Sequence, residues 1–563
     1  MYNALMDRRS FLKMASGACA VTASAGRLFA IAGPVDAAGR IYQWRPMELQ
    51  LASRRHYERP WSQVDISADF KGPAGQLLRV NGFWDGAAVW RVRFTPPAPG
   101  EWSYRLNCNT SDPAFTGVTG KFNALPAAGE YPLHRHGGIL RVAPDGHYLT
   151  YSDGTPFFWL GDTWWFCPSR LVPFDHSDHA GIPSMYKALI DKRRSEGFSV
   201  VQMAFLGSLG RHQDMASFMS LETGGVFDMS YWRKVDAYIN YANAAGIIPA
   251  IALGWHYDLN KHPLAEWKFL WRYVIARYGA SSVTWLITGE YNAPDSPVPK
   301  ALALGAFIRV CDPYQRAMSM HPWWYAGDKR QAWPQPWYSF IMFQGAHEGP
   351  SGTVPPTANY HQGWKFDKPV VEGEARYEHL RQFTADDVRR TAWHAMQAGC
   401  CGYTYGANGL WYPTQNAHDH KFWKDWGRSL PWWKAMNYPG AVQMGYMKTF
   451  YESMDWWRTV PRWNSLETSM KLDDSLQPLV RSWRDDLHVV WFPQGLAVDV
   501  KVSLKLIDGS GKFAYRGKWF NPRTGRYLKG ALALSSQAGV SYLPPRADAM
   551  DWVLLLQRAK GRR

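Results

Sequence analysis

Cysteine is scarce in this sequence, with six residues among 563. None belongs to a CxxC pair or a zinc-type Cys/His pattern, and six are too few for a disulfide scaffold. Apolar runs of about 20 residues, which a bilayer-spanning helix needs, are absent, and no glycine-rich phosphate loop follows a strand-like run. We therefore exclude a disulfide-rich module and an integral membrane protein, and we expect no metal site and no cofactor.

Aromatic and basic residues are abundant. The 31 Trp, 29 Tyr and 26 Phe make up 15% of the chain, a content that occurs where indole rings stack on sugars and also in packed cores. With 63 Lys and Arg against 47 Asp and Glu, the net charge is +16, which fits either an acidic glycan partner or a basic solvated surface. The basic residues are scattered and form no nucleic-acid-binding motif, so we expect no nucleic acid partner.

The first residues have the pattern of an export signal. The sequence DRRSFLK at 7–13 resembles the twin-arginine motif, and an Ala/Gly-rich stretch follows it up to a small-residue cleavage site near 35–37. We predict that residues 1–38 are a signal peptide read by the twin-arginine translocase. The mature bacterial protein is then expected in the periplasm or secreted.

Three folded regions are expected after this segment. Residues 42–126 contain short alternating runs, such as AVWRVRF at 88–94, between Gly/Pro turns, which predicts a β-sandwich. Residues 468–558 have the same character and predict a second β-sandwich. Between them, residues 134–455 alternate strand-like apolar runs with amphipathic helices such as 231–245.

The central region contains eight candidate strands, at 157–161, 200–206, 247–254, 283–288, 317–320, 338–343, 369–371 and 402–405. Eight such units with helices between them predict a (β/α)8 TIM barrel, and a doubly wound sheet is the alternative. The expected fold class is a multidomain α/β protein, in which a (β/α)8 barrel is flanked by N-terminal and C-terminal β-sandwich domains.

Two carboxylates follow apolar strands of the expected barrel, Glu290 after the fourth and Glu374 after the seventh. Chemistry in such barrels sits where strands end, and these two strands lie on opposite sides of the mouth. Cleavage of a glycosidic bond needs one acid for the leaving oxygen and one carboxylate at the anomeric carbon. We predict Glu290 and Glu374 as the catalytic pair. Glu372 has the same strand parity as Glu374, so alternation does not choose between them.

Polar and aromatic residues at the other strand ends complete the predicted site. For Asp162 a helix-capping role is an open alternative, and for His256 and His321 the alternative is a hydrogen-bonded core histidine. The predicted substrate-binding residues are Asp162, Trp164, Trp165, His256, Asn292, His321, Gln344 and Tyr405.

Three segments carry a family resemblance: WLGDTWW at 159–165, WLITGEYN at 285–292 and KPVVEGEARYE at 368–378. They resemble the catalytic domain of the apiosidase-like glycoside hydrolases. The resemblance implies that Glu290 is the acid/base and Glu374 the nucleophile. The chain departs from the family pattern at Glu372, where Asn is usual, and at Ala375, where Pro is usual.

The flanking regions carry resemblances of their own. Residues 42–126 resemble the small β-sandwich often found before this barrel, and the segment with WFNPRTG at 519–525 resembles a domain labelled as collagen-binding that often follows it. The resemblance implies a retaining glycoside hydrolase whose partner is an oligo- or polysaccharide of plants or microbes. The alternative is a non-catalytic carbohydrate-binding or adhesion protein on a barrel scaffold, and the presence of both Glu290 and Glu374 argues against it.

Overall fold

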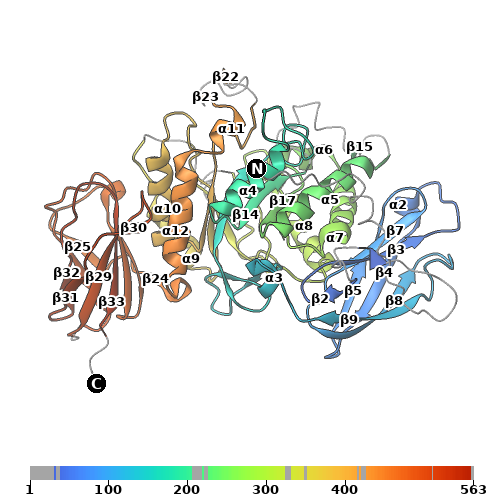
Figure 1. The fold of residues 1–563 in the computed structure, drawn as a ribbon, viewed down its shortest axis with the longest axis horizontal. Coiled ribbons are helices and arrows are strands. Elements are labelled where there is room, and N and C mark those ends of the chain that lie inside the picture. The colour runs from blue at the N-terminus through green and yellow to red at the C-terminus, as the bar shows by residue number, and fades with distance from the viewer. Residues whose placement is uncertain are drawn as a thin grey trace, which may run out of the picture.

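The computed structural model describes residues 31–32, 39–205, 219–220, 226–227, 229–323, 331–345, 347, 351–414, 418–419, 427–509 and 512–559. The predicted signal peptide therefore lies outside the described residues, apart from Ile31–Ala32. Figure 1 shows a central part built of helices around a sheet, with one group of strands on either side of it. None of the helices in the described residues is long and apolar enough to cross a membrane.

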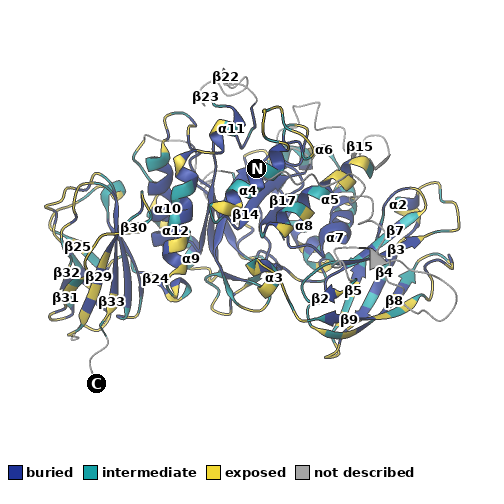
Figure 2. Ribbon diagram, in the orientation of Figure 1, coloured by how far each residue is buried: buried dark blue, intermediate teal, exposed yellow. Residues whose placement is uncertain are grey.

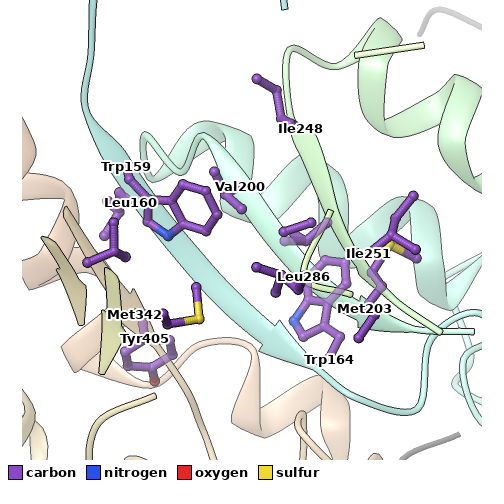
Figure 3. Close-up of a cluster of buried hydrophobic side chains, with 14 of the residues drawn as sticks. Trp159, Leu160, Trp164, Val200, Met203, Ile248, Ile251, Leu286, Met342 and Tyr405 are labelled. Carbon is purple, nitrogen blue, oxygen red and sulfur yellow. The ribbon is translucent and has the colours of Figure 1, made fainter. Parts of the chain in front are cut away.

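A curled parallel sheet of seven strands forms the centre. In spatial order its strands are β18 (Thr284–Trp285), β17 (Ile248–Ala252), β14 (Val200–Ala204), β13 (Trp159–Trp164), β21 (Gly402–Tyr405), β20 (Val370–Glu374) and β19 (Ile341–Gln344). Every residue of these strands is buried, as expected for parallel strands covered on both faces. Figure 3 shows part of this core around Trp159 and Trp164.

The segment 317–320 lies between the two edge strands of this sheet. Met318 forms a parallel bridge with Trp285 of β18, and the Ser319 amide donates to the Trp285 carbonyl at 2.9 Å. On its other side, the Ser339 amide donates to the Met318 carbonyl at 2.9 Å. These bonds tie the β18 edge to the chain that leads into β19.

Helices follow the strands and cover the outside of the sheet (Figure 1). Most of them bury one apolar face. α10 is buried along most of its length because it lies between β21 and the C-terminal strands (Figure 2), and the end of α7 is buried throughout Tyr273–Tyr278. The main helices are α4 (Met185–Ser195), α5 (Met229–Ala244), α7 (Leu264–Tyr278), α8 (Val298–Cys311), α9 (Thr357–Trp364), α10 (Ala385–Ala398) and α12 (Pro439–Glu452).

The N-terminal strands form two sheets that share one core. Alternation in β7 places Trp90, Val92 and Phe94 inside, and Phe94 stacks on Phe70 of the other sheet with ring centroids 3.8 Å apart. The first sheet holds β1 (Ile31–Ala32), β3 (Met47–Ala52), β7 (Val89–Phe94) and β6 (Phe83–Trp84). The second holds β2 (Ile41–Tyr42), β9 (Thr119–Leu125), β8 (Gly100–Cys108), β4 (Ile66–Lys71) and β5 (Leu77–Asn81).

The C-terminal strands also form two sheets, and the larger one packs against α10. There the Arg389 guanidinium of α10 contacts the Asp551 carboxylate at 2.6 Å, with both side chains almost fully buried. The larger sheet holds β24 (Val460–Pro461), β26 (Leu479–Trp483), β27 (Leu487–Phe492), β33 (Trp552–Arg558), β29 (Ala514–Asn521), β30 (Arg526–Tyr527) and β31 (Leu532–Ser535). The smaller holds β25 (Leu466–Thr468), β28 (Val502–Lys505) and β32 (Val540–Tyr542).

Short elements connect these layers. The helices among them are α2 (Pro60–Gln63), α3 (Pro132–His136), α6 (His256–Lys261), α11 (Trp432–Ala435) and the 3-10 turns Trp456–Arg458 and Asp474–Leu476. The strands are β10 (Arg141–Val142), β11 (Leu149–Thr150), β12 (Pro156–Phe157), β15 (Met219–Ser220), β16 (Val226–Phe227), β22 (His418–Asp419) and β23 (Arg428–Ser429).

Candidate active site

A β-bulge decides which glutamate of β20 faces the strand ends. Phe343 of β19 pairs with Glu372, but the next residue, Gln344, pairs with Glu374, so Gly373 is an extra residue in β20. A bulge of this kind re-aims the side chains that follow it. The expectation that Glu372 and Glu374 share one face, drawn from simple alternation, is therefore corrected.

The Glu374 carboxylate is surrounded by four side-chain nitrogen atoms. Trp165 Nε1 donates to Oε2 at 2.8 Å, and His321 Nε2 lies 3.1 Å from the same oxygen. Gln344 Nε2 donates to Oε1 at 3.1 Å, and His347 Nε2 lies 2.8 Å from it. Burial raises the pKa of Glu374, but the contacts with His321 and His347 outweigh it and hold the pKa well below the ordinary range. Glu374 is thus a charged, fixed carboxylate.

Glu290 has the opposite electrostatic environment. Burial, and after it the negative charge of Glu374, raises the pKa of Glu290 to about 8, although a hydrogen bond with Trp255 lowers it. His256 Nδ1 lies 3.5 Å from Glu290 Oε2, and the Glu290 side chain is 25% exposed to solvent. Glu290 therefore holds its proton at neutral pH, beside a carboxylate that has lost its own.

The backbone at Glu290 is strained. Its φ of 51° lies in the left-handed region, as does the φ of 44° at Ile287. Residues other than glycine rarely adopt this conformation, and such strain concentrates at functional sites. The turn ends the extended run of β18 after Trp285 and aims the Glu290 side chain toward Trp255 and His256.

Five of the predicted substrate-binding residues lie around this pair or just behind it. Trp165, His321 and Gln344 contact Glu374, and His256 lies beside Glu290. Asn292 lies behind them: its Oδ1 accepts a hydrogen bond from the Trp323 amide at 2.7 Å and so fixes the chain that follows His321.

Three predicted substrate contacts face the helices instead. Asp162 Oδ2 accepts from Arg193 Nε of α4 at 2.6 Å and from Trp164 Nε1 at 2.8 Å. The Tyr405 hydroxyl donates to Glu378 at 2.6 Å. Asp162, Trp164 and Tyr405 are at most 1% exposed. We reassign these three as structural residues, because their polar atoms are occupied by Arg193 of α4, by one another or by Glu378.

Glu372 is enclosed on the outer side of the sheet. The Tyr360 hydroxyl of α9 donates to its Oε2 at 2.6 Å and the Gly345 amide to its Oε1 at 2.8 Å. Burial raises the pKa of Glu372 to about 8. Because its partners belong to α9 and to the chain after β19, Glu372 takes no part in the Glu290/Glu374 pair.

Two residues of the site were missed by sequence reasoning, His347 and Tyr377. His347 contacts Glu374 directly, and the Tyr377 hydroxyl lies 3.2 Å from Trp165 Nε1. Both lie in loops three residues beyond a strand end, so a search limited to the strand ends cannot find them. Within the described residues no three His, Cys, Asp or Glu side chains gather in a way that could hold a metal ion.

Comparisons with known proteins show the family to which the chain belongs. The family model "Apiosidase-like, catalytic domain" matches residues 143–458. The chain belongs to the apiosidase-like family. This apiosidase-like protein is accordingly a glycoside hydrolase. Further models match on either side: a domain of unknown function (DUF5060) at residues 40–109 and a "Putative collagen-binding domain of a collagenase" at residues 474–557.

Solved structures show the same fold for the apiosidase-like protein. A "putative glycoside hydrolase from Bacteroides vulgatus" is 18% identical with a TM-score of 0.66, over 92% of this chain and 100% of that chain. A glycoside hydrolase family 5 structure from the same organism is 21% identical with a TM-score of 0.59, over 76% of this chain and 94% of that one. No curated protein matches the chain.

Proposed function

We propose that this glycoside hydrolase cleaves glycosidic bonds of a plant or microbial polysaccharide with retention of anomeric configuration. The observation that carries the proposal is the divided protonation of two neighbouring carboxyl groups. Glu374 is held charged by hydrogen bonds from Trp165 and Gln344 and by the close contacts of His321 and His347, and the environment of Glu290 raises its pKa to about 8. Glycosidases require this division between nucleophile and acid.

The chemistry follows from these two states. A Glu374 oxygen attacks the anomeric carbon, the bond to the leaving oxygen breaks, and Glu290 gives its proton to that oxygen. Glu290, now charged, takes a proton from a water molecule, whose oxygen attacks the same carbon and breaks its bond to Glu374. Two displacements at one carbon leave the anomeric configuration unchanged.

The proposal includes the complete barrel and its flanking domains. With 317–320 as the fifth strand, the curled sheet would close into a (β/α)8 barrel, and the hydrogen bonds of Met318 and Ser319 support this closure. The paired sheets on either side would be β-sandwiches. In the C-terminal pair, Val502 of the smaller sheet and Val490 of the larger one belong to one apolar cluster.

Export belongs to the proposal as well. The motif DRRSFLK at 7–13 supports passage through the twin-arginine translocase and a periplasmic or secreted location. The exported enzyme would then encounter its polysaccharide substrate outside the cytoplasm.

The test separates the two roles by leaving group. Glu290→Ala should slow cleavage of natural polysaccharides by about 10²–10⁴-fold. It should spare much of the reaction of nitrophenyl glycosides, which need no proton, and azide should rescue turnover by attacking the glycosyl-enzyme. Glu374→Ala should lose activity on both kinds of substrate. Glu372→Gln is the matched control and should keep its activity.

Product stereochemistry completes the test. Proton NMR of the first product should show the anomeric configuration of the substrate. An inverted product would overturn the retaining mechanism. Wild-type enzyme that binds polysaccharides but cleaves neither them nor a panel of nitrophenyl glycosides would favour the non-catalytic binding protein instead.

A further inference from the structure

A cavity lies at the end of the central sheet remote from Glu290 and Glu374. It has a volume of about 790 Å³, within the range of roughly 300–1,000 Å³ typical of small-molecule sites. Asn243, near the end of α5, and Ser282, just before β18, line it. It therefore lies at the amino ends of the parallel strands, whereas the catalytic pair follows their carboxyl ends.

Paired charges form the wall on the side of the N-terminal strands. Arg91 contacts Glu48 and, at 2.6 Å, Asp85. Arg93 contacts Glu48 at 2.8 Å and Asp236 of α5 at 2.7 Å. All five side chains line the cavity and are largely buried. These ion pairs span from β3 and β7 to α5, so they give the cavity a fixed polar wall.

Other lining side chains have hydrogen-bonding capacity left. Arg45 Nε is buried and has no hydrogen-bond partner in the part of the chain that the structure describes. Arg233 donates one hydrogen bond, to the Asp85 carbonyl at 2.8 Å. Among the described residues, neither the Glu130 carboxylate nor the Trp44 indole N–H has a hydrogen-bond partner. Arg45 Nε is buried and the Trp44 side chain is half-buried, and groups of this kind need partners, which a bound ligand can provide. Arg233 and Glu130 are exposed, so a ligand in the cavity can reach them from the solvent side.

Trp44 is held against the cavity by a strained backbone. Its φ of 62° lies in the left-handed region, where a bulky residue is an outlier. Its ring lies over Gly137, where an added Cβ would come within 2.8 Å of Trp44 Cδ2. Tyr131, next to α3, adds a second aromatic ring to the lining, and α3 lies between the central part and the N-terminal strands (Figure 1). Strain of this kind recurs at ligand clamps.

We propose that this cavity binds a neutral oligosaccharide, at a site separate from the catalytic pair. Four arginines and four carboxylates line it, so the charges balance and an anion gains no net attraction. Sugar hydroxyls both donate and accept hydrogen bonds, which suits carboxylates beside guanidinium groups. A pyranose face can stack on the Trp44 ring. The choice of a sugar rests on the proposed function, because binding here would hold the enzyme on its polysaccharide.

The test counts binding sites in a protein that cannot hydrolyse the probe. Xylotetraose and cellotetraose are titrated into the Glu374→Gln variant by isothermal calorimetry, with inorganic phosphate as the anionic probe. Adding Trp44→Ala or Arg233→Ala should lower the number of oligosaccharide sites by one. Lys234→Ala is the matched control, because Lys234 is exposed next to Arg233 on α5 but does not line the cavity.

Three results would overturn the proposal. The number of oligosaccharide sites could be the same in both cavity variants as in Glu374→Gln alone, neither sugar could bind to the Glu374→Gln variant, or phosphate could compete with the sugar for the same site. Arg233→Ala in the otherwise wild-type enzyme should leave kcat/KM on a nitrophenyl monoglycoside unchanged. That measurement depends only on the catalytic pair, so failure of the cavity proposal and failure of the glycosidase proposal are read from different assays.

Discussion

The pH dependence of kcat/KM tests the protonation of Glu290 directly. With a pKa of about 8, roughly 90% of Glu290 carries its proton at pH 7, whereas an ordinary pKa of 4.5 would leave about 0.3% protonated. The basic limb of the profile reports the acid of the free enzyme. We therefore expect this limb near pH 8, and expect the acidic limb, set by Glu374, far below it.

Trp255→Phe should move the basic limb in a known direction. The indole hydrogen bond stabilises the charged form of Glu290 and lowers its pKa, so its removal should raise the pKa and shift the limb to higher pH. A hydrogen bond to a charged group contributes about 1.5–3 kcal/mol, or about one to two pKa units at 1.36 kcal/mol per unit. Because the Glu290 side chain is 25% exposed, water replaces part of this, and we expect a rise of about half to one unit.

The assay measures kcat/KM from pH 5 to pH 10 on a phenyl glycoside, whose leaving group needs a proton. Trp164→Phe is the control, because Trp164 faces α4 and bonds Asp162; its profile should keep the wild-type limb. Glu290→Gln should have no basic limb. A basic limb that persists in Glu290→Gln, or a limb that stays in place or falls in Trp255→Phe, would refute the assignment of Glu290 as the acid.

Three further outcomes are expected. Burial raises the pKa of Glu372 to about 8 from 4.5, so the folded state loses stability as the pH rises from about 4.5 to about 8. Glu372→Gln should remove that loss. The Tm difference between the variant and the wild type, measured at pH 5 and at pH 8–9, should therefore change in favour of the variant at the higher pH. Arg193→Met leaves the buried Asp162 without its charged partner and should lower the free energy of unfolding by about 3–5 kcal/mol in urea titrations. Arg8→Lys with Arg9→Lys should keep the protein in the cytoplasm, and its normal accumulation in the periplasm on cell fractionation would contradict the export signal.

The order of elements in the central region was predictable from the sequence. The apolar runs at 200–206 and 247–254 contain β14 and β17, because parallel strands buried on both faces are apolar throughout. The run at 283–288 yields the much shorter β18. The left-handed turn at Ile287 ends β18, and the hydrophobic pattern of the sequence does not predict such a turn.

Side-chain direction was harder to predict than strand position. The choice between Glu372 and Glu374 depends on a bulge, which arises from the pairing of β19 with β20 and leaves no local pattern. For Asp162 a usable signal existed: Asp162 and Trp165 are three residues apart, so an extended strand cannot aim both toward the same side. His347 lies outside any strand, and its contact with Glu374 depends on loop geometry alone.

The left-handed backbone at Glu290 means that the side chain needed for catalysis lowers the stability of the folded protein. Glycine adopts a φ of 51° freely, whereas a side chain there costs on the order of 1–3 kcal/mol. The half-enclosed carboxyl group adds a further cost whenever it ionises. A mutant library selected for thermal stability alone should therefore drift toward glycine at position 290 and lose most of its cleavage of natural polysaccharides as its Tm rises. Only selection that also requires cleavage would retain the glutamate.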